Sequence, residues 1–124
     1  MASITVVIGD PPYGKQRAYT ALRFALAALF EKHSVNLFLL EDAVLLAKKG
    51  QEPKEMPSLL EHAAMPNCEH LLKACIKQGM TVGICGVCCS ERALKQEELV
   101  EGCQISSMKN LVNWVVKSDK VMFF

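Results

Sequence analysis

The sequence predicts a three-layer α/β/α domain around a mostly parallel sheet. Short runs of apolar, β-branched residues alternate along the chain with segments of helical periodicity, which is the order of a parallel α/β fold. The strand-like runs are almost continuously apolar, as in strands that are covered on both faces. The chain has 124 residues, of which 51% are hydrophobic and 22% charged. We therefore expect residues 1–124 to form one domain with its own core.

The first third of the chain predicts a strand, a turn and a helix. Residues 3–9 are rich in β-branched residues and predict the first strand. Residues 10–14 contain two prolines and a glycine, which are typical of a turn. Residues 15–32 predict a helix with an alanine-rich inner face, since apolar residues recur at steps of three and four: Ala18, Ala21, Leu22, Ala25, Leu26 and Leu29.

The middle of the chain predicts a second strand and three helices. Residues 35–40 are apolar and of strand length. Residues 43–49 follow two acids, end in two lysines and precede Gly50, which is typical helix punctuation. Residues 51–57 predict an exposed loop, and Ser58 with Glu61 matches a capping box for a short helix that ends near residue 65. Asn67 is a suitable cap for a helix over residues 67–78.

The last third predicts three strands and two helices. Residues 80–84 predict the third strand, and a helix is expected to start near Ser90 and to run over residues 91–100. Residues 102–105 predict a short edge strand and residues 120–124 a final strand. Residues 107–117 predict a helix with four inward side chains, Leu111, Val112, Val115 and Val116.

Charge and hydropathy narrow the class of protein. Fourteen basic and thirteen acidic residues give a formal net charge of +1, which argues against a broad nucleic-acid or membrane surface. The N-terminus lacks a basic segment, and Asp10 and two prolines break its apolar run, so we expect no secretory signal. We therefore expect a cytoplasmic protein whose cysteines are reduced, without nucleic-acid or membrane partners.

Three of the six cysteines lie between Ile84 and Arg92, in the order Ile-Cys-Gly-Val-Cys-Cys-Ser-Glu-Arg. A strand-to-helix turn lies at the carboxyl end of the sheet, where open α/β sheets place ligands. A helix start or a nearby arginine increases the fraction of thiolate, so Arg92 is a candidate partner. We predict a reactive thiol at Cys85; the alternative is a buried cysteine that only packs. Cys88 is a candidate resolving thiol, or else a residue of the first helical turn without chemistry.

Other candidates carry weaker signals. Asp10, Tyr13 and Gly14 follow the first strand, so they are expected at the same rim as Cys85 and are candidates for lining a ligand pocket. A plain turn is the alternative. The segment lacks the glycine spacing and the Lys-Ser/Thr ending of a phosphate loop, and we expect no cofactor. We also expect no metal site, because no second Cys-x-x-Cys pair is present, and we expect the remaining cysteines to pack: Cys68, Cys75, Cys89 and Cys103.

Several segments together resemble the DsrE/TusD/YchN-like (DsrE/DsrF-like) family of small intracellular sulfur-relay proteins. The segments are an apolar strand that runs into residues 9–14, residues 35–44, Gly50-Gln51, residues 82–85 leading to Arg92, and the tail 118–124. The resemblance implies a five-stranded α/β/α sheet, assembly into homotrimers or homohexamers, and one cysteine that carries sulfur as a persulfide. The matching position is Cys85, and Cys88 gives the Cys-x-x-Cys form of part of the family. Arg92-Ala93 departs from the Arg-Gly that often follows in the family.

Three functions remain open. The first is a sulfur carrier or sulfurtransferase that passes persulfide sulfur through Cys85 between donor and acceptor proteins. The second is a non-catalytic oligomeric module that binds a ligand or senses redox state. The third is a dithiol oxidoreductase that uses Cys85 and Cys88, although the Trp or Pro usual near such a pair is missing.

Overall fold

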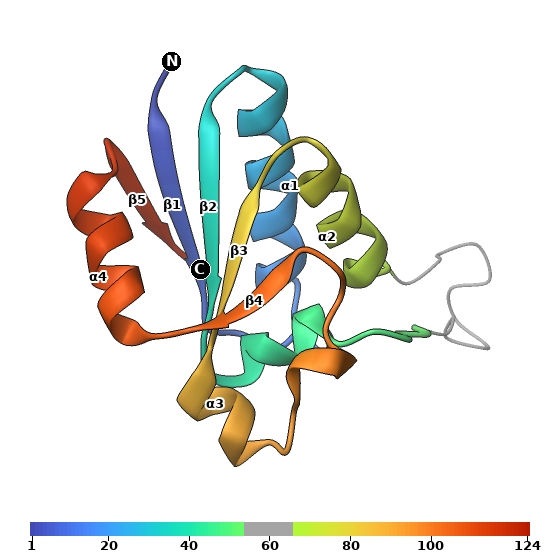
Figure 1. Ribbon diagram of the computed structural model, residues 1–124. Coiled ribbons are helices and arrows are strands. Elements are labelled where there is room, and N and C mark those ends of the chain that lie inside the picture. Colours follow the sequence, from blue (N-terminus) through green and yellow to red (C-terminus); the bar gives the residue numbers. More distant parts are fainter. Residues whose placement is uncertain (54–65) are drawn as a thin grey trace.

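The computed structural model describes residues 1–53 and 66–124 and contains a five-stranded sheet in which every pairing is parallel. The strand order is β4-β3-β2-β1-β5, so β4 and β5 are the two edges. Figure 1 shows the strands side by side, with the chain's N-terminus at one end of the sheet. The strands are β1 (Ser3–Ile8), β2 (Ser34–Leu39), β3 (Thr81–Cys85), β4 (Cys103–Ser106) and β5 (Lys120–Phe123).

Helices cover both faces of this sheet. Two helices, α1 (Arg17–Phe30) and α2 (Cys68–Lys77), lie together on one face, and α4 (Met108–Lys117) lies on the other (Figure 1). The short helix α3 (Gly86–Glu91) and the 3-10 helix η1 (Glu41–Ala47) lie beyond the carboxyl ends of the strands. A second 3-10 helix, η2 (Gln96–Glu98), lies between α3 and β4. The predicted α/β/α fold is therefore confirmed.

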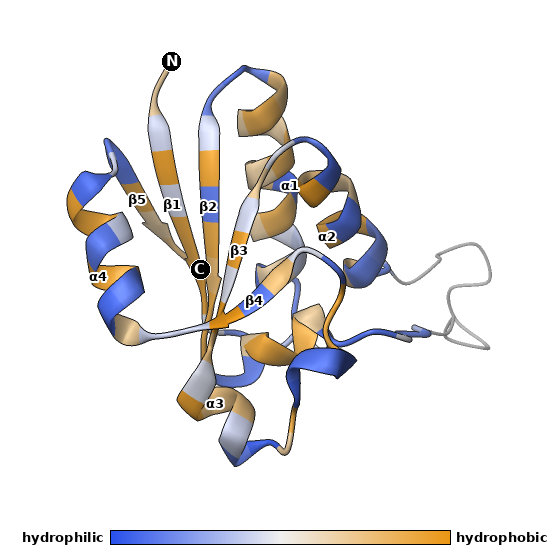
Figure 2. Cartoon of the chain, viewed as in Figure 1, coloured by the Kyte–Doolittle hydropathy of each residue, from blue (hydrophilic) through white to orange (hydrophobic). Residues whose placement is uncertain are grey.

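The core is built from the central strands and the inner face of α1. In Figure 2 the central strands β1, β2 and β3 carry orange hydrophobic bands, and β2 has one blue band among them. Both faces of these strands meet helices, which explains why the strands read as continuous apolar runs. The side chains of α1 that pack here are small, and they allow the helix to approach the sheet closely. Fully buried residues of this region include Val6, Leu37, Phe38, Ile84, Ala18, Ala21 and Ala25.

Two predicted helices differ from the structure. The prediction of a helix over residues 91–100 is wrong, because α3 begins at Gly86, directly after the third strand, and ends at Glu91. A turn follows in which Ala93 has a positive φ of 53°, and the chain then reaches η2. The segment predicted as a helix over residues 43–49 is the 3-10 helix η1. The helix predicted to end near residue 65 lies outside the described residues.

The helix predicted over residues 107–117 is present as α4, but its inward face is narrower than predicted. Leu111 is buried, whereas Val112 is 53% exposed and Val116 is 77% exposed. Contact with the sheet is made largely by Trp114, whose ring meets that of Phe38 edge-on with centroids 6.1 Å apart. This large ring holds α4 on the sheet while one side of the helix stays uncovered.

The two ends of the segment that joins η1 to α2 are fixed by a buried carboxylate. Oε1 of Glu69 accepts hydrogen bonds from the backbone N–H groups of Gly50 (2.9 Å) and Gln51 (2.8 Å). Its Oε2 lies 3.0 Å from Nζ of Lys73. Burial raises the pKa of Glu69, but the hydrogen bond from Lys73, the N–H groups and the lysine charge outweigh it, so its pKa lies below the ordinary value.

Replacing this carboxylate is expected to weaken the fold in a pH-dependent way. Because the pKa is lowered in the folded state, the stabilisation is present above the unfolded-state pKa of about 4.3 and is lost as pH falls through the lower folded-state value. Glu69→Gln should reduce the free energy of unfolding by about 1–3 kcal/mol at pH 7, and the difference should shrink below pH 4. Urea unfolding at both pH values measures this, with Glu31→Gln on the exposed end of α1 as control. An equal loss at both pH values would contradict the assignment.

Among the described residues, no helix is long and apolar enough to cross a membrane.

Candidate functional site

The cysteine cluster lies where β3 meets α3, at the carboxyl-end rim of the sheet. Cys85 is the last residue of β3 and precedes Gly86, the first residue of α3. In the neighbouring strand Ser106 is its register partner. A side chain at Gly86 would meet the carbonyl oxygen of Ser106 at 3.2 Å, which explains a glycine at this position. The strand-to-helix location predicted for Cys85 is therefore present.

The thiols at this rim are almost covered. Cys85 is 5% exposed and Cys88 is 9% exposed, while Cys89 is buried in the core. The thiol predicted to be reactive is thus almost covered in the single chain. Cys85 directly precedes α3, and Cys88 lies on this helix of only six residues. Chemistry at either sulfur requires that the atoms covering it move.

Cys88 is held by the first residue of η1. The backbone N–H of Glu41 donates a hydrogen bond to Sγ of Cys88 over 3.0 Å. Glu41 has a positive φ of 54°, a conformation that residues other than glycine rarely adopt and that the surrounding structure must stabilise. The contact joins the first residue of η1 to the first turn of α3. It also supplies the sulfur of Cys88 with a fixed hydrogen-bond donor.

Cys85 and Cys88 interact with each other. Burial and a side-chain hydrogen bond with Cys85 raise the pKa of Cys88, and the Glu41 N–H and the Arg92 charge only partly oppose them. Burial and the neighbouring Cys85 thus both favour the neutral thiol form of Cys88.

The other four cysteines are poor candidates for thiolate chemistry. Burial raises the pKa of Cys68 and of Cys75 to about 11 and that of Cys103 to about 12. Burial also raises the pKa of Cys89. All four side chains pack in the core, as predicted.

Arg92 acts on the backbone near the thiols, not on a sulfur directly. Its Nε and Nη2 donate to Oδ1 of Asp42 over 3.1 and 2.9 Å, and its Nη1 donates to the carbonyl oxygen of Cys88 over 3.1 Å. The guanidinium thus ties the end of α3 to η1 and fixes the turn that carries Cys88. Sequence reasoning missed Asp42 and the Glu41 N–H, because a backbone donor and a partner 50 residues away leave no local pattern.

The three predicted ligand-pocket residues lie at the end of β1, but Tyr13 is engaged elsewhere. Its hydroxyl donates to Oε1 of Gln51 (2.6 Å) and accepts from the backbone N–H of Cys68 (3.2 Å). Asp10 forms an ion pair with Lys15 over 3.8 Å. Gly14 has a positive φ of 93°, as a tight turn requires. These contacts join the turn after β1 to α2, and a ligand-binding role for the three residues stays a prediction.

Within the described ranges, no group of three or more His, Cys, Asp or Glu side chains is arranged to hold a metal ion.

Comparison with known proteins gives a consistent result over the full chain. The model of the DsrE/DsrF-like family matches residues 2–124. An uncharacterised protein of Methanopyrus kandleri is 52% identical over 121 residues, covering 98% of this chain and 93% of its own. A second uncharacterised protein, from Methanocaldococcus jannaschii, is 49% identical over 120 residues and covers 97% of both chains. The crystal structure of the YchN protein from Escherichia coli is similar with a TM-score of 0.89 and 28% identity, covering 100% of both chains.

Proposed function

This chain belongs to the DsrE/DsrF-like family, and we propose that it is a cytoplasmic sulfur carrier that passes persulfide sulfur through Cys85 from a donor protein to an acceptor protein. The observation that carries the proposal is the pairing of Cys85 with Cys88 at the strand-to-helix rim. Cys85 also occupies the position that the family resemblance assigns to the sulfur-carrying residue.

The proposed transfer has two displacement steps. The thiolate of Cys85 attacks the outer sulfur of a donor persulfide, R–S–SH, so that a new S–S bond forms and the donor leaves as R–S⁻. The donor thiolate takes the proton, which leaves Cys85–S–S⁻ and R–SH. An acceptor thiolate then attacks the outer sulfur and releases Cys85 as a thiolate. No net oxidation occurs, because each step exchanges one S–S bond for another.

The rim geometry supports a carrier that opens to receive its partners. α3 has six residues and is joined to η1 by the Arg92–Asp42 ion pair and by the Glu41–Cys88 hydrogen bond. Cys85 directly precedes α3, so a displacement of this helix would change how the thiol is covered. A protein donor that contacts α3 is able to supply that displacement through its binding energy.

Persulfide loading tests the proposal. The reduced protein is incubated with a small persulfide donor, and the intact mass is then measured. We expect a gain of about one sulfur, ~32 Da, that is lost in Cys85→Ser and kept in Cys88→Ser. Parallel alkylation of the folded and urea-unfolded protein shows whether Cys85 is reached in the native state. Absence of the adduct from the wild-type protein, or its persistence in Cys85→Ser, would contradict the proposal.

The contact between the two thiols favours a second candidate, a reversible Cys85–Cys88 disulfide that senses or transfers oxidising equivalents. A disulfide oxidant R–S–S–R would take two electrons and leave as two thiols, while Cys85 and Cys88 lose two hydrogens. Mild oxidation should then lower the intact mass by about 2 Da in the wild-type protein and in neither single serine variant. A Cys85 persulfide without this disulfide separates the carrier from the redox module.

We also propose that the chain assembles into a homo-oligomer through α4 and β5. Met108, Val112 and Val116 follow one another at steps of four on the uncovered side of α4. Phe123 is 65% exposed on β5. Because Phe124 contacts Phe24 of α1, alternation along the strand points Phe123 to the face on which α4 lies.

The two edges of the sheet support the choice of β5 over β4. The side chain of Gln96 covers the β4 edge: its Nε2 donates to the carbonyl oxygen of Cys103 (2.8 Å) and its Oε1 accepts from the N–H of Ile105 (2.9 Å). On β5, both backbone groups of Phe124 bond to β1 and its continuation, so those of Phe123 point to the open side. An uncovered strand edge beside an apolar helix face suits a second copy of the chain.

A further inference from the structure

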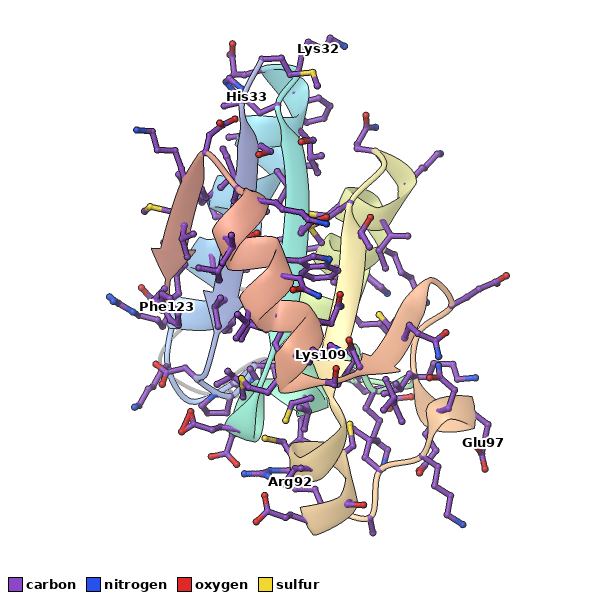
Figure 3. All side chains as sticks on the ribbon, turned by 60° about the vertical axis from the view of Figure 1, so that its left-hand side comes forward. Lys32, His33, Arg92, Glu97, Lys109 and Phe123 are labelled. Carbon is purple, nitrogen blue, oxygen red and sulfur yellow. The ribbon has the colours of Figure 1, made fainter. Side chains whose placement is uncertain are left out.

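The helix α4 begins at the same rim as Cys85, and its first turn is basic. Ser107 caps the helix by accepting a hydrogen bond from the N–H of Asn110 over 3.2 Å. By position, the N–H groups of Met108 and Lys109 have no partner within the helix. The first turn contains no acidic residue. Figure 3 labels Lys109 at the end of α4 that is nearest α3, while Arg92 lies directly after α3.

The side chain of Cys85 points toward this first turn. A side chain at Gly83 would meet the rings of Phe38 and Trp114 at 3.2 Å, so position 83 faces the α4 layer. Side chains two residues apart on a strand point to the same face, which places the thiol of Cys85 on the α4 face as well. Ser106, opposite Cys85, confirms this direction, because its Oγ accepts a hydrogen bond from Nδ2 of Asn110 on α4 (2.8 Å).

Lys109 is a basic side chain at this rim that is not held in an ion pair among the described residues. Arg92 is bound to Asp42 and to a backbone carbonyl, and Lys15 is paired with Asp10. Among the described residues, Lys109 forms no ion pair. The remaining charged or titratable groups near the thiol are Cys88, Cys89 and Glu91 on α3 and Glu41 and Asp42 on η1.

We propose that Lys109 and the first turn of α4 form the anion-binding wall of the Cys85 site, which holds the negatively charged sulfur of the thiolate and, when loaded, of the persulfide. A helix N-terminus and an ammonium group both favour an anion. The long lysine side chain is exposed and is able to follow the outer sulfur as it extends from Cys85. The sequence suggested that the helix directly after Cys85 stabilises the anion. That helix, α3, is too short for this role. The persulfide half of the proposal rests on the carrier function, whereas the thiolate half does not.

Alkylation with two reagents of nearly equal shape tests the wall. The folded protein is treated with iodoacetamide, which is neutral, and with iodoacetate, which is anionic, and the modification of Cys85 is followed by peptide mass over a range of pH. In each case the thiolate displaces iodide and forms one S–C bond. We compare the wild-type protein with Lys109→Gln, with Lys109→Arg as the charge-retaining variant, and with Lys117→Gln at the other end of α4 as control.

Loss of the ammonium group should change two measured quantities in the Lys109→Gln protein. The pH of half-maximal alkylation should move upward, and the ratio of the iodoacetate rate to the iodoacetamide rate should fall about three- to tenfold, less at high salt. Lys109→Arg should restore both, and Lys117→Gln should change neither. An unchanged ratio in Lys109→Gln, or an equal change in Lys117→Gln, would overturn the proposal. If only the carrier function is wrong, persulfide loading fails, whereas the alkylation rates still show the effect of Lys109.

Discussion

A protein that carries Val112→Glu and Val116→Glu is expected to be a monomer, whereas the wild-type chain is expected to be an oligomer. Both valines project from the side of α4 that the sheet does not cover. In an interface each would remove apolar area worth about 1.5–3 kcal/mol, and each glutamate would instead bury a charge without a partner. Two such charges exceed what a subunit contact of ordinary strength tolerates. Size-exclusion chromatography with light scattering at micromolar concentration measures the mass.

The matched control is Val87→Glu, since Val87 is 71% exposed on α3 and lies outside the α4–β5 surface. This variant should keep the mass of the wild-type oligomer. The double variant should retain its fold, because the replaced side chains contribute little to the core of the single chain; circular dichroism checks this. A monomeric wild-type protein, or an oligomer that survives both glutamates, would exclude this surface as the subunit contact.

Gly83→Val is expected to destabilise the protein by about 3 kcal/mol, a large part of a typical folding free energy. Position 83 lies between the rings of Phe38 and Trp114, and even its first added carbon would sit 3.2 Å from each. Valine adds two further methyl groups that have no space unless α4 moves off the sheet. Since Cys85 follows two residues later, persulfide loading should fall as well. Urea unfolding followed by the fluorescence of Trp114, the one tryptophan in the sequence, measures the effect.

Thr81→Val is the control for this variant, because Thr81 lies on the same strand and face but is exposed. It should change the free energy of unfolding by no more than about 0.5 kcal/mol. If Gly83→Val were as stable as Thr81→Val, α4 would not be held on the sheet by the packing of Trp114 over Gly83. The basis for placing the thiol of Cys85 beside α4 would then be lost.

The sequence by itself determined the fold class, the strands and the place of the cysteines. An apolar run rich in β-branched residues, such as residues 3–9, favours a strand between two covered faces, and a cysteine directly after such a strand is expected at the rim. Local cues also sufficed for Asn67, whose side chain caps α2 by accepting from the N–H of His70 over 3.1 Å. These features depend on residues that are close together in the chain, so a local pattern carries them.

Only the tertiary structure decided what surrounds each sulfur. The Glu41 N–H reaches Cys88 across 47 positions and Arg92 reaches Asp42 across 50, and no periodicity encodes such pairs. The same holds for α4: its spacing indicated an inner face, but Trp114 and Leu111 make most of the contact and leave Val112 and Val116 in solvent. The physical reason is that hydrophobic periodicity records which side chains avoid water, in this chain or in an assembly, but not which neighbour covers them.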